Sequence, residues 1–91
     1  MKYVLIYTSA DDIAERAPEH FPAHRARWDE FHSRGELLMI GPYSDRSAAL
    51  AVFTTRQAAE EFAQGDPFVV HGVVRSWEIK EWMEALVQEG A

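Results

Sequence analysis

Four segments of the chain have the apolar pattern of β-strands. They are short, rich in β-branched and aromatic side chains, and separated by glycine, proline and polar residues. In the first three segments, apolar residues occupy both alternating faces. A strand of an antiparallel sheet with one wet face alternates apolar and polar residues instead, so we expect both faces of this sheet to be covered. The predicted strands are residues 2–8, 36–40, 48–54 and 73–80.

Two longer segments have the three- and four-residue spacing of amphipathic helices. For residues 17–34, a proline near the start and Gly35 just past the end are the boundary signals. The apolar stripe of this helix consists of Phe21, His24, Trp28 and Phe31. The second helix is predicted to follow a capping box of Thr54 and Gln57 and to stop at Gly65. Its buried positions are Ala58, Ala59 and Phe62.

Shorter signals complete the pattern. Residues 41–45, GPYSD, have the composition of a turn between the second and third strands. Asp66 and Pro67 suit the cap and the first position of a short helical turn. On the fourth strand, Val73, Trp77 and Ile79 are predicted to share one face. A brief amphipathic helix is predicted over residues 81–88.

The order β-α-β-β-α-β is that of an α+β, ferredoxin-like (split βαβ) fold with a four-stranded antiparallel sheet. Two helices can cover only one face of this sheet. In the first strand, however, Val4 and Ile6 lie on one face, and Leu5 and Tyr7 on the other. A second copy of the chain is the simplest cover for the remaining face. We therefore predict a homodimer in which two sheets pack face to face as a dimeric α+β barrel; assembly into a higher oligomer stays open.

Length and composition fit one small domain. The chain has 91 residues and is 47% hydrophobic, which suits a single domain over residues 1–91 and is too short for two. It contains no cysteine, so its stability has to come from packing or self-association rather than from a disulfide. The lack of cysteine also fits a reducing compartment, and we expect the protein to be cytoplasmic.

Charge and hydropathy exclude two classes of partner. The net charge of −6 argues against a nucleic-acid-binding surface, one face of which should be basic. No segment approaches the roughly 20 apolar residues that cross a membrane. The apolar start of the chain, residues 3–7, is short and lacks a cleavage pattern, so it is interpreted as a strand rather than as a secretion signal.

His24 and Asp66 are the candidates for chemistry. His24 lies on the inward stripe of the first helix, where it is either a hydrogen-bonded core residue or part of a site. Asp66 is either an ordinary helix cap or a functional carboxylate. In a split βαβ fold the start of the first helix and the end of the second can meet at one end of the helix layer. A carboxylate that accepts from one ring nitrogen would make the other nitrogen a better base.

Other chemistry has weaker support. His20 and His24 have the spacing of a metal pair on a helix, but Pro22 is expected to place His20 before the first full turn. Glu19 is the one obvious third ligand nearby, and we predict no metal site. The chain has no glycine-rich phosphate loop and no nucleophile elbow, and we predict no cofactor.

Residues 22–42 (PAHRARWDEFHSRGELLMIGP) and 65–82 (GDPFVVHGVVRSWEIKEW) resemble the YCII-related proteins, also called the DGPF domain family. The resemblance extends over nearly the whole chain. The second segment is the more specific, because Asp-Pro-Phe is followed by a glycine four residues after the phenylalanine. This resemblance implies a dimeric α+β barrel and an active site built on a histidine and an aspartate, which correspond by position to His24 and Asp66.

The resemblance also implies which residues complete the cleft. They are Gly41 and Pro42, whose backbone can approach a ligand closely, and Phe68 as an apolar wall. Many relatives have a basic residue one turn before the histidine, where this chain has Phe21. An anion-binding role at the site would therefore fall to Arg16 or Arg25.

Three functions stay open at this point. In the first, Asp66 orients His24 as a general acid/base that acts on a small organic molecule without a cofactor, as a lyase, isomerase or dehalogenase. In the second, the same cleft belongs to a non-catalytic metabolite-binding or accessory protein. The third is a cofactor-free oxygenase, which would need a site rich in His, Asn and Trp facing the barrel interior. Fold alone cannot decide among them.

Overall fold

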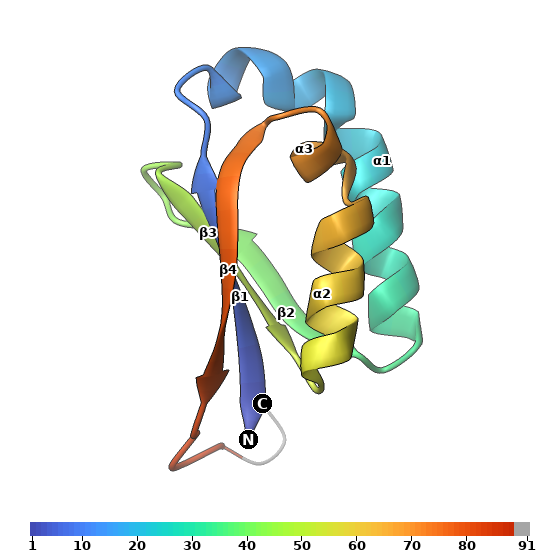
Figure 1. Ribbon diagram of the computed structural model, residues 1–91, viewed down its shortest axis with the longest axis vertical. Coiled ribbons are helices and arrows are strands. Elements are labelled where there is room, and N and C mark those ends of the chain that lie inside the picture. Colours follow the sequence, from blue (N-terminus) through green and yellow to red (C-terminus); the bar gives the residue numbers. More distant parts are fainter. Residues whose placement is uncertain (89–91) are drawn as a thin grey trace.

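A four-stranded antiparallel sheet carries the helices on one of its faces (Figure 1). The structure, a computed structural model, describes residues 1–88. Its elements are β1 (Lys2–Ser9), α1 (Ile13–Ser33), β2 (Leu37–Pro42), β3 (Ala48–Phe53), α2 (Arg56–Gly65), α3 (Pro67–Val70) and β4 (Val74–Trp82). The strand order β2-β3-β1-β4 confirms the predicted ferredoxin-like arrangement. Within the described residues, no helix is both long and apolar enough to cross a bilayer.

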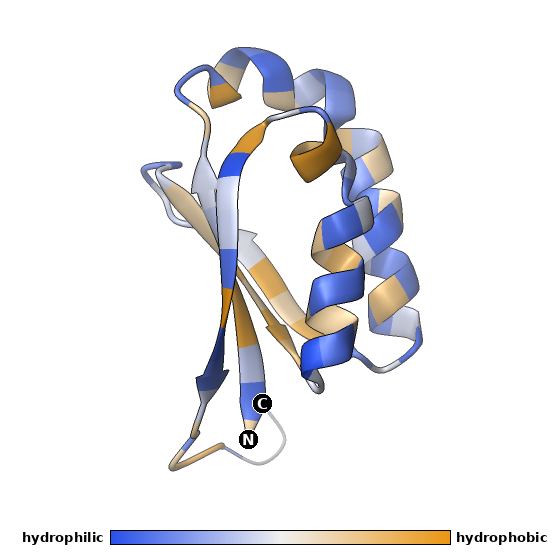
Figure 2. Ribbon diagram, in the orientation of Figure 1, coloured by the Kyte–Doolittle hydropathy of each residue, from blue (hydrophilic) through white to orange (hydrophobic). Residues whose placement is uncertain are grey.

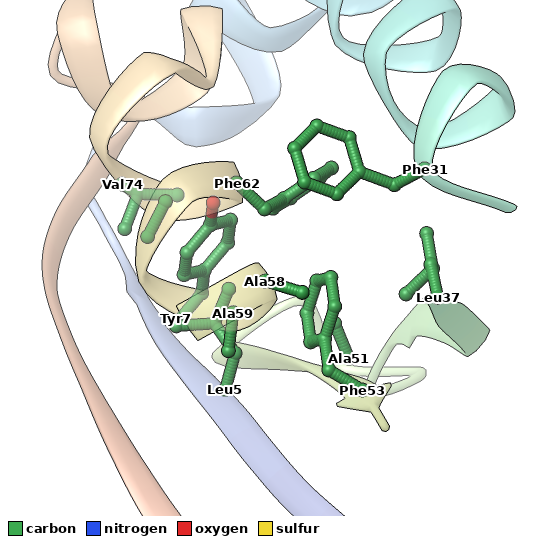
Figure 3. Packing of buried hydrophobic residues seen from close by; sticks show 11 residues of the cluster. Leu5, Tyr7, Phe31, Leu37, Ala51, Phe53, Ala58, Ala59, Phe62 and Val74 are labelled. Atoms are coloured by element: carbon green, nitrogen blue, oxygen red, sulfur yellow. The ribbon is translucent and has the colours of Figure 1, made fainter. Parts of the chain in front are cut away.

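The core lies between the sheet and the helices. Leu5 of β1 pairs with Ala51 of β3 on the face toward the helices, and the small alanine leaves room for the large rings above it. Phe31 of α1 and Phe62 of α2 meet edge to face, with ring centroids 5.2 Å apart, over Phe53 of β3 (Figure 3). Burying each phenylalanine contributes about 2–3 kcal/mol relative to leaving it exposed. This aromatic cluster fixes the position of α1 and α2 over the sheet.

Helix α1 begins at Ile13, four residues before the predicted start, and Pro18 and Pro22 lie inside it. The prediction treated proline as a boundary, because each proline removes an N–H that would bond the carbonyl four residues earlier. The helix continues nonetheless, since Ile13 and Ala17 extend its inward stripe over the sheet. Farther along this stripe, His24 and Phe31 are buried as predicted.

The hairpin between β2 and β3 differs in detail from the predicted turn. Gly41 and Pro42 belong to β2 rather than to the turn, and Pro42 pairs with Ala49. A proline is tolerated there because β2 is an edge strand and one side of it needs no ladder hydrogen bonds. The turn itself covers residues 43–47.

The cap of α2 lies one residue later than predicted. Thr55, not Thr54, is the N-cap residue, and its side chain accepts a hydrogen bond from the backbone N–H of Ala58 at 3.1 Å. Thr54 instead bonds through its backbone N–H to the carbonyl of Glu36, so it still belongs to the link between β2 and β3. The predicted buried positions of this helix are confirmed.

Strand β4 is displaced toward the C-terminus and the predicted final helix is wrong. A register shift opposite Thr8 and Ser9 brings Val74 onto the core face that Trp77 and Ile79 share, while Val73 precedes the strand and is completely buried. Residues 81–82 continue β4 because they pair with the start of β1, and residues 83–88 form no helix. Hydrogen bonding to β1 outweighs the weak amphipathic pattern of this segment.

The face of the sheet opposite the helices is apolar at its centre. On this face Val4 pairs with Val52, and Ile6 pairs with Leu50. In Figure 2 the apolar colours extend along β1 to β3, whereas β4 carries more hydrophilic residues. Glu78 of β4 lies opposite Ile6 on this face. The predicted two-sided apolar pattern is therefore present, and the helices cover only one of its two sides.

Candidate active site

Asp66 occupies the junction between α2 and α3 and is completely buried. Its Oδ1 accepts a hydrogen bond from the backbone N–H of Phe68 at 3.1 Å, and Pro67 takes the first position of α3. The predicted helix cap is thus confirmed. A single backbone donor cannot satisfy a buried carboxylate, which has two oxygens to pair, so further donors are required.

His24 supplies the second donor. It lies on α1, its side chain is 7% exposed, and its Nδ1 is 2.7 Å from Oδ1 of Asp66. Because an ionised carboxylate can only accept hydrogen bonds, Nδ1 carries the proton and donates it. In the neutral imidazole Nε2 then has a free lone pair. This is the arrangement in which a carboxylate fixes the tautomer of a histidine base.

Tyr7 supplies the third donor, from β1. Its hydroxyl donates to Oδ2 of Asp66 at 2.6 Å, and Figure 3 shows this hydroxyl pointing away from the strand. Burial, the charge of Asp66 and this hydrogen bond raise the pKa of the Tyr7 hydroxyl above its ordinary value of 10.0. Tyr7 therefore remains a donor at all physiological pH values. Tyr7 was not predicted as a site residue; its available signal in the sequence is a tyrosine on the inward face of a strand, whose buried hydroxyl needs a partner.

Aromatic side chains fix the orientation of the His24 ring. Phe68 stacks on it, with centroids 3.9 Å apart and planes 5° from parallel, and Trp28 contacts it edge on at 5.1 Å. Within residues 1–88 no hydrogen bond reaches Nε2. Every buried polar side-chain atom in this part of the chain has a hydrogen-bond partner, so Nε2, which has none, is not a buried atom. It follows that Nε2 is open to the space that His24 lines.

That space is a cavity of about 750 Å³ between α1 and the sheet. Its volume lies in the range of small-molecule sites, and its lining is mainly apolar. Phe21, which is 40% exposed, and Trp28 belong to this lining together with the first turns of α1. A small ring compound would have apolar walls on several sides and the Nε2 atom of His24 within the same enclosure.

Gly41, Pro42 and Phe68 line the cavity, where the family resemblance had put them. Arg25 does not: it is exposed and outside the lining. One residue along a helix turns the side chain by 100°, so Arg25 points away from the stripe that carries His24. Arg16 is engaged elsewhere, because its guanidinium bonds the carbonyl oxygens of His71 and Gly72. The structure therefore places neither of the two predicted arginines in the lining of the cavity.

Arg46 lines the cavity instead. It lies in the turn between β2 and β3, one residue past the predicted turn of residues 41–45, and was not predicted as a site residue. Nothing in its local sequence distinguishes Arg46 from a solvated turn residue. Only the folding of the hairpin beside α1 brings it to the site.

Arg27 holds α2 against α1 near the His24–Asp66 contact. Its Nε donates to the carbonyl of Phe62 at 3.0 Å and its Nη2 to that of Glu61 at 2.6 Å. These carbonyls lie near the C-terminal end of α2, where helix carbonyls can accept from side-chain donors. Since Arg27 follows His24 by three residues and Glu61 precedes Asp66 by five, this contact sets how the two helices meet.

His20 is not joined to His24 in a shared site. Its ring stacks on His71, with centroids 4.2 Å apart, while His24 bonds Asp66. Within the part of the chain that the structure describes, no group of three or more acidic or imidazole side chains is placed to hold a metal ion.

Comparison with known proteins places this chain in a family. The sequence model of the YCII-related domain matches residues 1–83. The chain belongs to the YCII-related family. It is 33% identical to Protein YciI of Escherichia coli O6:H1 (strain CFT073) over 92 aligned positions, which cover 88% of this chain and 94% of that protein. Protein YciI of Shigella flexneri gives the same values.

Among solved structures, this YCII-related chain is similar to 5-chloro-2-hydroxyhydroquinone dehydrochlorinase (TftG) from Burkholderia phenoliruptrix AC1100 in complex with 2,5-dihydroxybenzoquinone. The TM-score is 0.72, and the match covers 93% of this chain and 96% of the other at 14% identity. At that identity the likeness concerns the fold, and it agrees with the α+β architecture expected from the family resemblance.

Proposed function

We propose that this protein is a cofactor-independent enzyme that transfers a proton on a small organic molecule, with His24 as general base and acid. The observation that carries the proposal is the 2.7 Å contact of His24 Nδ1 with the buried Asp66, which leaves Nε2 open to a cavity of about 750 Å³. In this arrangement Asp66 is a positioning residue, since it acts on the substrate only through His24.

The proposed reaction begins when Nε2 of His24 takes a proton from a C–H or O–H group of the substrate. The resulting imidazolium is stabilised by the Asp66 carboxylate, which Tyr7 and the Phe68 N–H hold in place. In an isomerisation His24 returns the proton to another atom of the same molecule. In an elimination a leaving group departs with the electron pair of its bond, and His24 later passes the proton to water. A base of this kind contributes about 10²–10⁴-fold to the rate.

Loss of a hydrogen halide is the variant that we favour. It is supported by the shared fold with a dehydrochlorinase and by a cavity whose apolar walls suit one ring. On a halogenated hydroquinone, one hydroxyl proton would first be transferred to the ring carbon that bears the halogen. Removal of the proton of the second hydroxyl and departure of the halide with its bonding electrons would then leave a quinone. No external oxidant or reductant is needed, because the halide carries away the electron pair.

We also infer a homodimer built through the helix-free face of the sheet. Val4 and Ile6, with their partners Val52 and Leu50, would be covered by the same residues of a second copy. This proposal explains why the sheet is apolar on a face that no helix covers.

The test is halide release from halogenated hydroquinones by the purified protein and by a His24→Gln variant. Glutamine can still bond Asp66 but cannot take up a proton, so release should fall by about 10²–10⁴-fold while the fold is retained. A matched His32→Gln variant, changed at an exposed histidine farther along α1, should keep its activity. Saturable binding without turnover, unchanged in His24→Gln, would instead identify a non-catalytic binding protein.

A further inference from the structure

The cavity has a charge of its own. Among the described residues that line it, Arg46 alone carries a permanent charge, and no carboxylate accompanies it. Asp66 is completely buried and is not part of the lining. The chain as a whole has a net charge of −6, so a cavity with a cation and no anion differs in sign from its surroundings. Such a site favours anionic ligands over neutral ones.

The guanidinium of Arg46 is not committed to another group. Arg16 and Arg27 donate to backbone carbonyls, and Arg34 pairs with Glu36. Within residues 1–88 the Arg46 side chain, by contrast, forms no hydrogen bond and no ion pair. Its five N–H donors are therefore available to a carboxylate or an ionised hydroxyl, which a guanidinium can bind in a bidentate manner.

The backbone conformation of Arg46 is a second observation that bears on its side chain. Its φ of 65° lies in the left-handed region, which costs a residue with a Cβ about 1–2 kcal/mol. Glycine would adopt this conformation without that cost. The turn holds it through a bond from the Arg46 N–H to the Tyr43 carbonyl at 2.9 Å, and Asp45 accepts from the N–H and hydroxyl of Ser47. None of these hydrogen bonds involves the Arg46 side chain, so the turn leaves that side chain free to serve another purpose.

We infer that Arg46 binds an anionic substituent of the ligand, and that the ligand is an aromatic ring carrying a carboxylate or an ionised hydroxyl. The ring would contact the apolar lining that Phe21, Trp28 and Phe68 provide, with its reacting atom toward His24. In equating this ligand with the substrate, the inference rests on the proposed function. Arg46 is thus a residue that determines specificity, contributed by the hairpin opposite α1.

Benzoate and benzamide test this inference, because they have the same ring and nearly the same shape but differ in charge. Their affinities are measured by NMR titration for the wild-type protein and for Arg46→Gly, Arg46→Lys and Arg25→Gln. The wild type should bind benzoate at least about tenfold more tightly than benzamide, as expected for a charge-assisted hydrogen bond. The preference should fall as salt is added, since Arg46 is exposed.

In Arg46→Gly the affinity for benzoate should fall to that for benzamide, and benzamide binding should not change. Glycine suits the left-handed turn, so this variant should be at least as stable as the wild type in urea. Arg46→Lys should keep part of the preference for benzoate over benzamide, and Arg25→Gln should keep the whole of it. Equal affinities in the wild type, absence of benzoate binding, or a preference that persists in Arg46→Gly would each overturn the inference.

Two further results separate this inference from the proposed function. His24→Gln should lose turnover but keep the benzoate preference, whereas Arg46→Gly should raise KM for an anionic substrate more than it lowers kcat. A benzoate preference that depends on Arg46 in a protein without turnover would support the inference and reject the enzyme. Turnover that depends on His24, in a protein without a preference for benzoate, would support the enzyme and reject the inference about Arg46.

Discussion

Asp66 accepts hydrogen bonds from three parts of the chain: the backbone of α3, His24 on α1 and Tyr7 on β1. Helix capping and orientation of the imidazole are therefore not alternatives for this side chain, because one carboxylate does both. A fully buried carboxylate that loses one of these donors becomes partly unsatisfied, which is costly away from water. At the residue scale, the site and the local fold depend on the same three contacts.

Tyr7→Phe should lower the free energy of unfolding by about 1.5–3 kcal/mol near neutral pH, because one oxygen of Asp66 loses its donor. The pH dependence is more diagnostic. The pKa of Tyr7 is raised in the folded protein, so above pH 10 the unfolded chain loses a proton that the folded chain keeps. Stability from this contact is complete below pH 10 and declines above it, by about 1.4 kcal/mol per pH unit. The difference in free energy of unfolding between wild type and Tyr7→Phe, measured by urea unfolding, should therefore become smaller between about pH 9 and about pH 11.

Tyr43→Phe is the matched control, since Tyr43 is exposed. Its stability profile should follow that of the wild type throughout. Parallel profiles for wild type and Tyr7→Phe would contradict the contact between Tyr7 and Asp66.

At the scale of elements, the site depends on how the end of α2 meets α1. Arg27 bonds two carbonyls of the last turn of α2, and its guanidinium lies 5.0 Å from the centroid of the Phe31 ring. A Cβ at Gly65 would be only 2.5 Å from Nη2 of Arg27. Gly65 is thus required for close approach of the guanidinium rather than for an unusual backbone angle.

A double-mutant cycle tests this contact. In the wild type, Gly65→Ala should displace the guanidinium and lose hydrogen bonds worth about 1–2 kcal/mol, against a gain of up to about 1 kcal/mol in helix propensity. In the Arg27→Met background only the gain remains, so Gly65→Ala should be more favourable there by about 1–2 kcal/mol. An Arg25→Met background should behave as the wild type does. Equal effects of Gly65→Ala in all three backgrounds would show that Arg27 does not join the helices.

The element pattern could be predicted from sequence where local signals and packing agree. The inward stripe of α1 and the cap at Asp66 are set by spacing and by a short motif, and both were predictable. The start of α1 was not, because two prolines signalled a boundary that tertiary packing overrides. The final helix failed for a related reason, since pairing with β1 extends β4 into that segment.

The residues of the site can also be divided into those that the sequence could predict and those that it could not. His24 and Asp66 carry signals that a sequence can show: a histidine on an apolar stripe and an aspartate before a proline. The signal of Tyr7 is weaker, a tyrosine on the inward face of a strand, and Arg46 has none, because the contact of Tyr7 and the proposed role of Arg46 depend on residues that are distant along the chain. Tyr7 and Asp66, for example, are 59 positions apart. Arg25 lies outside the cavity lining, because closeness in sequence to His24 does not put a side chain on the same helix face.

At the scale of the whole molecule, the apolar centre of the helix-free face, with Val4, Ile6 and Leu50 half-buried, is the surface on which the proposed dimer depends. We expect the wild type to sediment as a dimer, at twice the chain mass of 10.4 kDa, at micromolar concentration. Ile6→Glu should convert it to a monomer with unchanged circular dichroism, because a charge at the centre of the apolar face would be buried without a partner. Ala23→Glu, on the exposed side of α1, should remain dimeric. A wild-type protein that sediments as a monomer would remove the basis for the dimeric barrel.

In the proposed enzyme, Asp66 holds the Nδ1 proton of His24 and leaves Nε2 free as a base. Nitrogen NMR of the imidazole ring, at a pH where the ring is neutral, tests it most directly. We predict a protonated Nδ1 and an unprotonated Nε2 for His24 in the wild type, and loss of this tautomer preference in Asp66→Ala. A His24 ring whose proton resides on Nε2 in the wild type would contradict this role of Asp66.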